Sequence, residues 1–194
     1  MPEVSPVSLQ WLVNEIDEST PDEPAYTPVS RSEPMPVEIV DTREPQLVTI
    51  EVNIPLTAGA YSAGDAVGPV FEIPNMARFP GGGGIINTVS VENDAGQTDS
   101  MTLYLYDRKV AGVADNAAFT GGTDAEARRM QKPIPLSWYP VTAPTLNNIT
   151  GAAGIGQQYN CAPGERGMWG QLQTNGTPTH VANGVTLKIG VFRE

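Results

Sequence analysis

Residues 75–107 read NMARFPGGGGIINTVSVENDAGQTDSMTLYLYD and contain two runs that are typical of β-strands. Apolar and polar side chains alternate in residues 85–91 and again in residues 101–106. Because side chains on a strand point to opposite faces with a period of two, each run has one apolar face. Residues 93–99, between the runs, are rich in Asn, Asp and Gly, which favour turns. The stretch therefore predicts a β-hairpin.

The chain after residue 46 contains further short runs of this kind, separated by Gly- and Pro-rich segments. With 20 Gly and 18 Pro in 194 residues, sustained helices are not expected. Residues 123–130 are the exception, because Thr123 and Glu126 have the spacing of a helical capping box. Residues 141–156, which end in GAAGIG, are expected to form a loop. The further strands are expected at residues 47–54, 66–73, 134–139, 157–161, 168–174 and 185–191.

About eight short strands joined by turns indicate an all-β fold. The pattern predicts an antiparallel β-sandwich of the jelly-roll type, formed by residues 47–194.

Residues 1–46 differ from the rest and are expected to form an extended, Pro-rich, acidic N-terminal arm. One short amphipathic helix is expected within the arm, with Ser5 as its N-cap and an apolar stripe at helical spacing. Such a short helix is marginal alone in water, so we expect the stripe to bind a partner surface. The alternatives are that the helix folds back on its own domain or is disordered. The candidate partner-binding residues are Leu9, Trp11, Leu12, Val13 and Ile16, with Trp11 beside the stripe.

The net charge of −11 is unevenly distributed. Residues 1–46 hold ten acidic and two basic residues, whereas the remainder holds twelve and nine. An acidic chain gains nothing from phosphate neutralisation, so nucleic acid is not expected as a partner. The sequence also shows no apolar run of membrane-spanning length and no signal-peptide pattern, so neither a membrane nor secretion is expected.

Candidates for chemistry are few. His180 is the only histidine and Cys161 the only cysteine, so neither a structural zinc site nor an internal disulfide is expected. A catalytic pair formed by these two residues lacks any recognisable nucleophile signature. The glycines of residues 81–84 and 151–156 lack the strand–glycine–helix setting of phosphate-binding loops and are expected to form turns. No cofactor is therefore expected.

Two further sets of side chains have alternative interpretations. Four aspartates could form a calcium site, although turn formation explains them more simply; they are Asp94, Asp99, Asp107 and Asp115. Four aromatic residues could form a sugar-binding platform, although core or subunit packing is the commoner use; they are Tyr104, Tyr106, Trp138 and Tyr139.

Several segments resemble small structural proteins of tailed bacteriophages. The first are Asn75-Met76-Ala77-Arg78 with residues 81–86, then residues 101–107 (MTLYLYD) and residues 115–119 (DNAAF). The C-terminal part agrees, with Gly170-Gln171-Leu172, Gly176-Thr177-Pro178-Thr179 and the last strand. The likeness covers roughly residues 58–194 and leaves out the arm.

This resemblance implies a capsid decoration, or cement, protein. Such proteins are jelly-roll subunits, usually homotrimers, that bind the major capsid protein on the outer surface of the phage head and clamp neighbouring capsomers. The resemblance implies a virion protein without enzymatic activity. Two alternatives are a carbohydrate-binding receptor or fibre module of the virion and a jelly-roll enzyme, the latter disfavoured by the single histidine.

Overall fold

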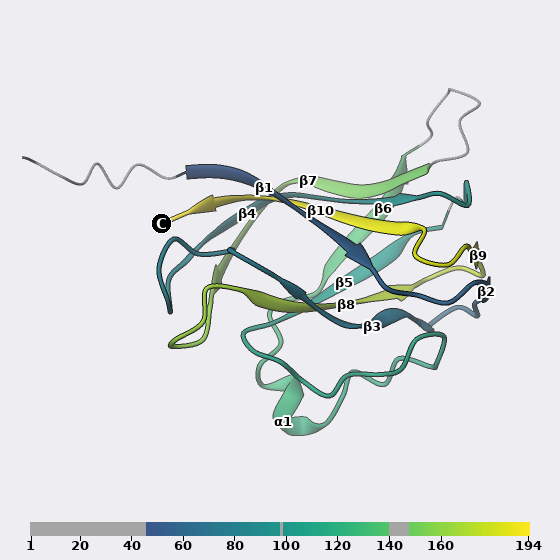
Figure 1. Cartoon of the computed structure of the whole chain (residues 1–194), viewed down its shortest axis with the longest axis horizontal. Helices are drawn as coiled ribbons and strands as arrows, with labels where there is room; N and C mark the ends of the chain where they lie inside the picture. The colour runs from purple at the N-terminus through teal and green to yellow at the C-terminus, as the bar shows by residue number, and fades with distance from the viewer. Residues whose placement is uncertain (1–45, 98, 140–147) are drawn as a thin grey trace, which may run out of the picture. The chain divides into compact units, whose positions relative to one another are not determined.

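A computed structural model of the protein describes residues 46–97, 99–139 and 148–194, which form two antiparallel β-sheets packed face to face (Figure 1). The all-β fold expected from the sequence is therefore confirmed. The elements in chain order are β1 (Gln46–Ile54), β2 (Gly59–Ala60), β3 (Ala66–Ile73), β4 (Gly83–Asn93), β5 (Met101–Tyr106), α1 (Asp124–Ala127), β6 (Ile134–Tyr139), β7 (Asn148–Asn160), β8 (Met168–Thr174), β9 (Thr179–His180) and β10 (Val185–Arg193).

Eight strands form one hydrogen-bonded series in the order β1-β10-β4-β7-β6-β5-β8-β3, and β2 pairs separately with β9. The series folds over at β6, whose first residues pair with β5 and whose last residues pair with β7. The pairs are nested in the order of the sequence. The first strand, β1, pairs with the last, β10, and between them along the chain β3 pairs with β8, β4 with β7 and β5 with β6. This nested antiparallel pairing across two sheets is a jelly roll.

The hairpin predicted for residues 75–107 is wrong, although both of its strands exist. β4 pairs with β10 and β7, whereas β5 pairs with β6 and β8. The turn after β4 instead begins a crossing from one sheet to the other. In this turn the Asp94 N–H donates to the Gly184 carbonyl (2.9 Å), and the Ala95 N–H donates to Asn93 Oδ1 (3.0 Å). Alternation identifies the apolar face of a strand but not the strand beside it.

The loop expected at residues 141–156 is also wrong where the structure describes it, because β7 begins at Asn148. Residues 140–147 lie outside the described part of the chain. β7 contains a β-bulge, at which three of its residues face a single residue of β4. Gly154 and Gly156 in this bulge both have positive φ (63° and 64°), a conformation that glycine adopts without steric strain.

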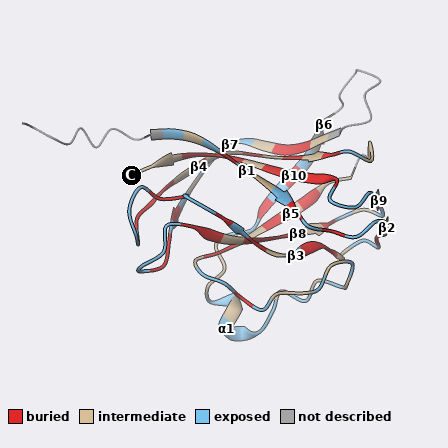
Figure 2. Ribbon diagram, in the orientation of Figure 1, coloured by how far each residue is buried: buried red, intermediate tan, exposed pale blue. Residues whose placement is uncertain are grey.

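The hydrophobic core lies between the two sheets (Figure 2). Alternate residues of β10 from Val185 to Val191 are buried, whereas Lys188 lies on the opposite face of the strand. From the other sheet, Leu103 of β5 and Leu172 of β8 belong to the same core cluster. The alternation read from the sequence therefore marks the core faces of these strands.

The helix α1 begins with the capping box predicted from the sequence. The Thr123 hydroxyl accepts a hydrogen bond from the Glu126 N–H, and the Glu126 carboxylate accepts one from the Thr123 N–H (2.7 Å). The same carboxylate accepts a hydrogen bond from the Ala111 N–H (2.6 Å). This single-turn helix therefore holds the long β5–β6 connection in place rather than contributing to the core.

Candidate functional site

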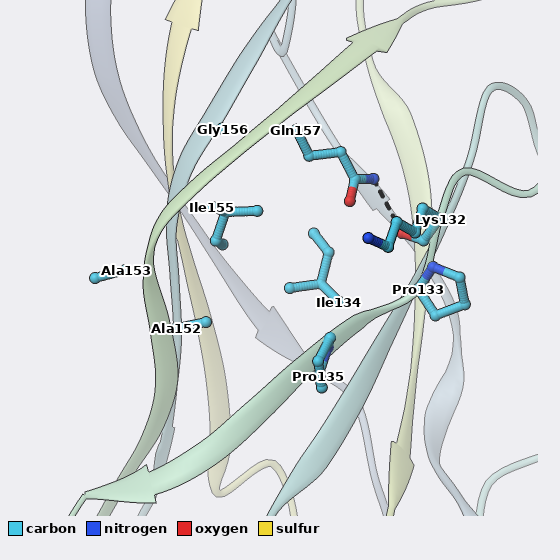
Figure 3. A pocket seen from close by; sticks show the side chains of 9 residues that line it. All are labelled: Lys132, Pro133, Ile134, Pro135, Ala152, Ala153, Ile155, Gly156 and Gln157. Carbon is cyan, nitrogen blue, oxygen red and sulfur yellow. Dashed lines mark hydrogen bonds between the residues drawn. The ribbon is translucent and has the colours of Figure 1, made fainter.

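A cavity of about 420 Å³ opens between β6 and β7, at the point where the two strands separate (Figure 3). We call it the β6–β7 window. Pairing between the strands reaches only as far as Ser137 and Gly151. At the other end of the window, the Gln157 side-chain amide donates to the Lys132 carbonyl (2.9 Å). The residues that line the window are Lys132, Pro133, Ile134, Pro135, Ala152, Ala153, Ile155, Gly156 and Gln157.

The sequence explains why the strands separate here. Pro133 and Pro135 have no N–H group and cannot donate to a ladder of hydrogen bonds. On the other side, the bulge at Gly154 and Gly156 turns the edge of β7 away from regular pairing. A proline pair therefore lies opposite a glycine bulge, and neither strand can close the gap.

The window is mainly apolar, with two polar side chains at one end. Ile134 is buried and Ile155 is half-buried, and both lie between the strands (Figure 3). Lys132 and Gln157 supply the polar groups, and no acidic residue lines the cavity. The window has no nucleophile or general base, but it suits an apolar group with an attached negative charge.

Sequence reasoning missed this site because it treated residues 151–156 as turns. The informative signal was the pair formed by Pro133, directly before β6, and Pro135 within it, since proline in a sheet marks an edge or an interruption.

A second polar cluster surrounds Asp115 in the β5–β6 connection. The Asp115 carboxylate accepts hydrogen bonds from the Thr57 N–H (2.8 Å) and hydroxyl (2.7 Å), the Tyr61 hydroxyl (2.8 Å) and the Gly68 N–H (2.8 Å). Burial alone raises the pKa of this carboxyl, but these hydrogen bonds outweigh burial and hold the pKa below its ordinary value. Asp115 therefore ties its own loop to the residues that follow β1 and to β3, which is a structural role.

His180 is buried at the end of β9. Its Nδ1 lies 3.1 Å from Asn93 Nδ2, and its ring meets the Tyr61 ring edge-on at 4.8 Å between centroids. Burial lowers the pKa of His180, against the opposing effect of the Asp115 charge. The ring is therefore held in its neutral form within the core.

Cys161 lies far from His180. The Cys161 N–H donates to the Gly82 carbonyl, beside the first residue of β4, whereas His180 contacts Asn93, the last residue of β4. A strand rises about 3.3 Å per residue, so β4 separates the two side chains by roughly 30 Å. They form no catalytic pair. Burial and, secondarily, the charge of Glu165 raise the pKa of the Cys161 thiol to about 11.

The aspartates considered for calcium do not form a cluster. Within residues 46–97, 99–139 and 148–194, no three His, Cys, Asp or Glu side chains lie close enough together to hold a metal ion.

Two of the four aromatic residues considered for a sugar-binding platform, Tyr104 and Tyr106, are engaged in packing. Tyr106 is buried, and Tyr104 packs against Phe119 at 4.3 Å between ring centroids. The Tyr104 hydroxyl donates to Gln173 Oε1 (2.9 Å). These two side chains therefore serve packing, while those of Trp138 and Tyr139 lie outside the described part of the structure.

The candidate arm residues also lie outside the described residues, as does the short helix expected to carry them; they are Leu9, Trp11, Leu12, Val13 and Ile16. In the part of the chain that the structure describes, no helix is long and apolar enough to cross a membrane.

In comparisons with known proteins, no protein-family model and no curated protein sequence matches the chain.

Proposed function

We propose that this chain is a non-enzymatic structural protein of a bacteriophage virion, which decorates the outer surface of the capsid and stabilises contacts between capsomers. The major capsid protein is the proposed partner, and the proposed form on the particle is a homotrimer.

The main support is the way in which the phage-like segments fit the jelly roll. Residues 101–106 form β5, which lies between β6 and β8. Residues 115–119 begin with Asp115, which accepts four hydrogen bonds, and end with Phe119, which packs on Tyr104. The resemblance thus rests on residues that shape the fold, as is expected for a protein whose function is to present a surface.

The outer face of the β10-β4-β7 layer gives further support. Gly190, Thr88 and Ala153 lie in one row across the three strands, on the face opposite the core. In the next row Ser90 and Gly151 are again small, but the β10 residue in that row is Lys188, whose ammonium group donates to the Glu92 carboxylate (2.6 Å). The Gly190–Thr88–Ala153 row therefore forms a narrow strip of small side chains beside a charged pair, and such a strip suits close contact with another protein surface.

The charge and the arm agree with an external position. An acidic subunit is repelled by packaged DNA, which favours the outer face of a capsid. The apolar stripe of the arm could contribute about 1.5–3 kcal/mol per buried side chain, before ordering costs, when bound to a capsid. Three arms on a trimer would bind cooperatively through their linkage.

Co-sedimentation with capsids that lack this protein tests the proposal. The full chain is expected to sediment with the particles and, by light scattering, to have three times the mass of one chain. Leu12→Asp in the predicted stripe should weaken attachment more than tenfold, whereas Gln10→Asp, with the same charge change off the stripe, should not. Deletion of residues 1–45 should abolish tight binding and leave the melting curve of the sandwich intact.

Absence of the full chain from the pellet at saturating concentration would refute capsid decoration. Equal sedimentation of the full and shortened chains would show instead that the sandwich domain, not the arm, is the anchor.

A further inference from the structure

We propose that the β6–β7 window binds an acidic peptide segment of a partner protein, which inserts one apolar side chain between Ile134 and Ile155 and places a carboxylate beside Lys132. This binding site does not depend on capsid decoration, because it follows from the charge, shape and edge chemistry of the window itself.

The distribution of charge favours an acidic partner. The chain has 22 acidic residues, yet none lies between Glu126 and Glu165. The same interval contains three basic residues, Arg128, Arg129 and Lys132, and the last of these lines the window. β6 and β7 therefore belong to a locally positive segment of a protein with net charge −11. An acidic peptide is attracted to this segment and repelled by most of the remaining surface.

The interior of the window favours an apolar group. Ile134 and Ile155 approach from the two separated strands, and Ala152 lies beside them (Figure 3). Ile155 and Ala152 are only partly buried although both pack against the core cluster, so apolar surface remains exposed in the opening. The volume of about 420 Å³ is within the range of small-ligand sites and accommodates an inserted side chain.

The edges of the window favour insertion of a side chain over addition of a strand. Strand addition requires a row of free N–H and carbonyl groups, and two donors are missing here, at Pro133 directly before β6 and at Pro135 within it. The Lys132 carbonyl already accepts a hydrogen bond from Gln157 (2.9 Å). Recognition therefore comes from the inserted apolar group and from the ion pair beside it.

Fluorescence anisotropy with the full chain tests this inference. The probe is a fluorescein-labelled peptide, Gly-Glu-Glu-Leu-Glu-Glu-Gly, and its matched forms replace either Leu by Ser or all Glu by Gln. The parent peptide is expected to bind at least tenfold more tightly than both matched forms. Lys132→Glu should weaken binding at least tenfold, and so should Ala152→Trp, whose side chain would extend from β7 into the window (Figure 3).

Arg108→Glu is the matched control, because it makes the same charge change at an exposed cation outside the window. It should reduce affinity less than threefold. Equal losses in Lys132→Glu and Arg108→Glu would overturn the proposal in favour of general electrostatic attraction. Equal binding of the Leu and Ser peptides would also overturn it, and so would no binding of the parent peptide. Binding of octanoate without binding of the peptide would assign the window to small amphiphiles instead.

The inference and the proposed function fail separately. A chain that binds capsids equally well with or without Lys132→Glu, and binds no peptide, would retain the decoration function and lose the window site. A chain that binds the peptide but no capsid would do the reverse.

Discussion

Replacement of Asp115 should destabilise the domain strongly, because this one carboxylate holds three segments together. It accepts four hydrogen bonds, two from Thr57, one from Tyr61 and one from Gly68, at 2.7–2.8 Å. A hydrogen bond to a charged group contributes about 1.5–3 kcal/mol, but such values are not additive within one network. Asp115 is also only partly buried, and water can replace some of the lost partners. We therefore expect Asp115→Ala to lower the free energy of unfolding by about 3–4 kcal/mol.

Asp115→Asn preserves the size of the side chain but leaves one acceptor oxygen and places an amide N–H₂ group opposite donor groups. We expect it to cost about 2–3 kcal/mol. Asp94→Asn, at an exposed position in the turn after β4, is the matched control and should change stability by less than about 0.5 kcal/mol.

The pH dependence gives a second test. The pKa of Asp115 is lower in the folded protein than in the unfolded chain, so its contribution is complete above about pH 4 and is lost as the pH falls through the folded value. Urea unfolding at pH 7 and pH 3 measures this directly. The gap between the wild type and Asp115→Asn should shrink at pH 3. A gap below about 0.5 kcal/mol at pH 7, or one of equal size at both pH values, would contradict the role assigned to the carboxylate.

Two further predictions concern the buried titratable groups. Burial lowers the pKa of His180, so the free energy of unfolding decreases as the pH falls below the unfolded pKa of about 6.5. In His180→Gln, urea titrations should no longer show this decrease between pH 7 and pH 5. The same substitution should lower the free energy of unfolding at pH 7 by about 1–3 kcal/mol. An unchanged pH slope would show that His180 does not titrate differently in the two states. The Cys161 thiol, with its pKa raised to about 11, should react with a thiol reagent at pH 8 at least tenfold more slowly in the native protein than in 8 M urea. Equal rates in native protein and urea would contradict its burial.

The sequence predicted most strands because alternation directly reports a half-buried face. β1, β5 and β10 match their predicted runs to within a few residues, and the α1 capping box was visible as Thr123 and Glu126. Which strands pair with each other was harder to predict from the sequence. β4 and β5 are joined by a segment with ordinary turn residues, which serve equally well in a hairpin and in a crossing between sheets.

Only the C-terminal end of β7 was predicted, as the strand at residues 157–161, and the rest was missed for a different reason. Glycine weakens the alternation signal, and the stretch that contains Gly151, Gly154 and Gly156 looks like a loop when read alone. In the fold, β4 on one side and the end of β6 on the other hold this strand in place. The β6–β7 window was not predicted either. Its glycine bulge and the interruption of β6 can be recognised only once the neighbouring strands are known.

The nested pairing of the jelly roll also sets the order in which the domain can be completed during synthesis. β5 and β6 are the innermost pair, whereas β1 is hydrogen-bonded, among the strands the structure describes, to β10 alone. Ile50 of β1 can therefore pair with Ile189 of β10 only after Ile189 has left the ribosome. During that interval β1 has no paired neighbour, and pairings this distant in sequence form slowly. Among the strands that the structure describes, β1 is therefore the one that stays unpaired longest during synthesis.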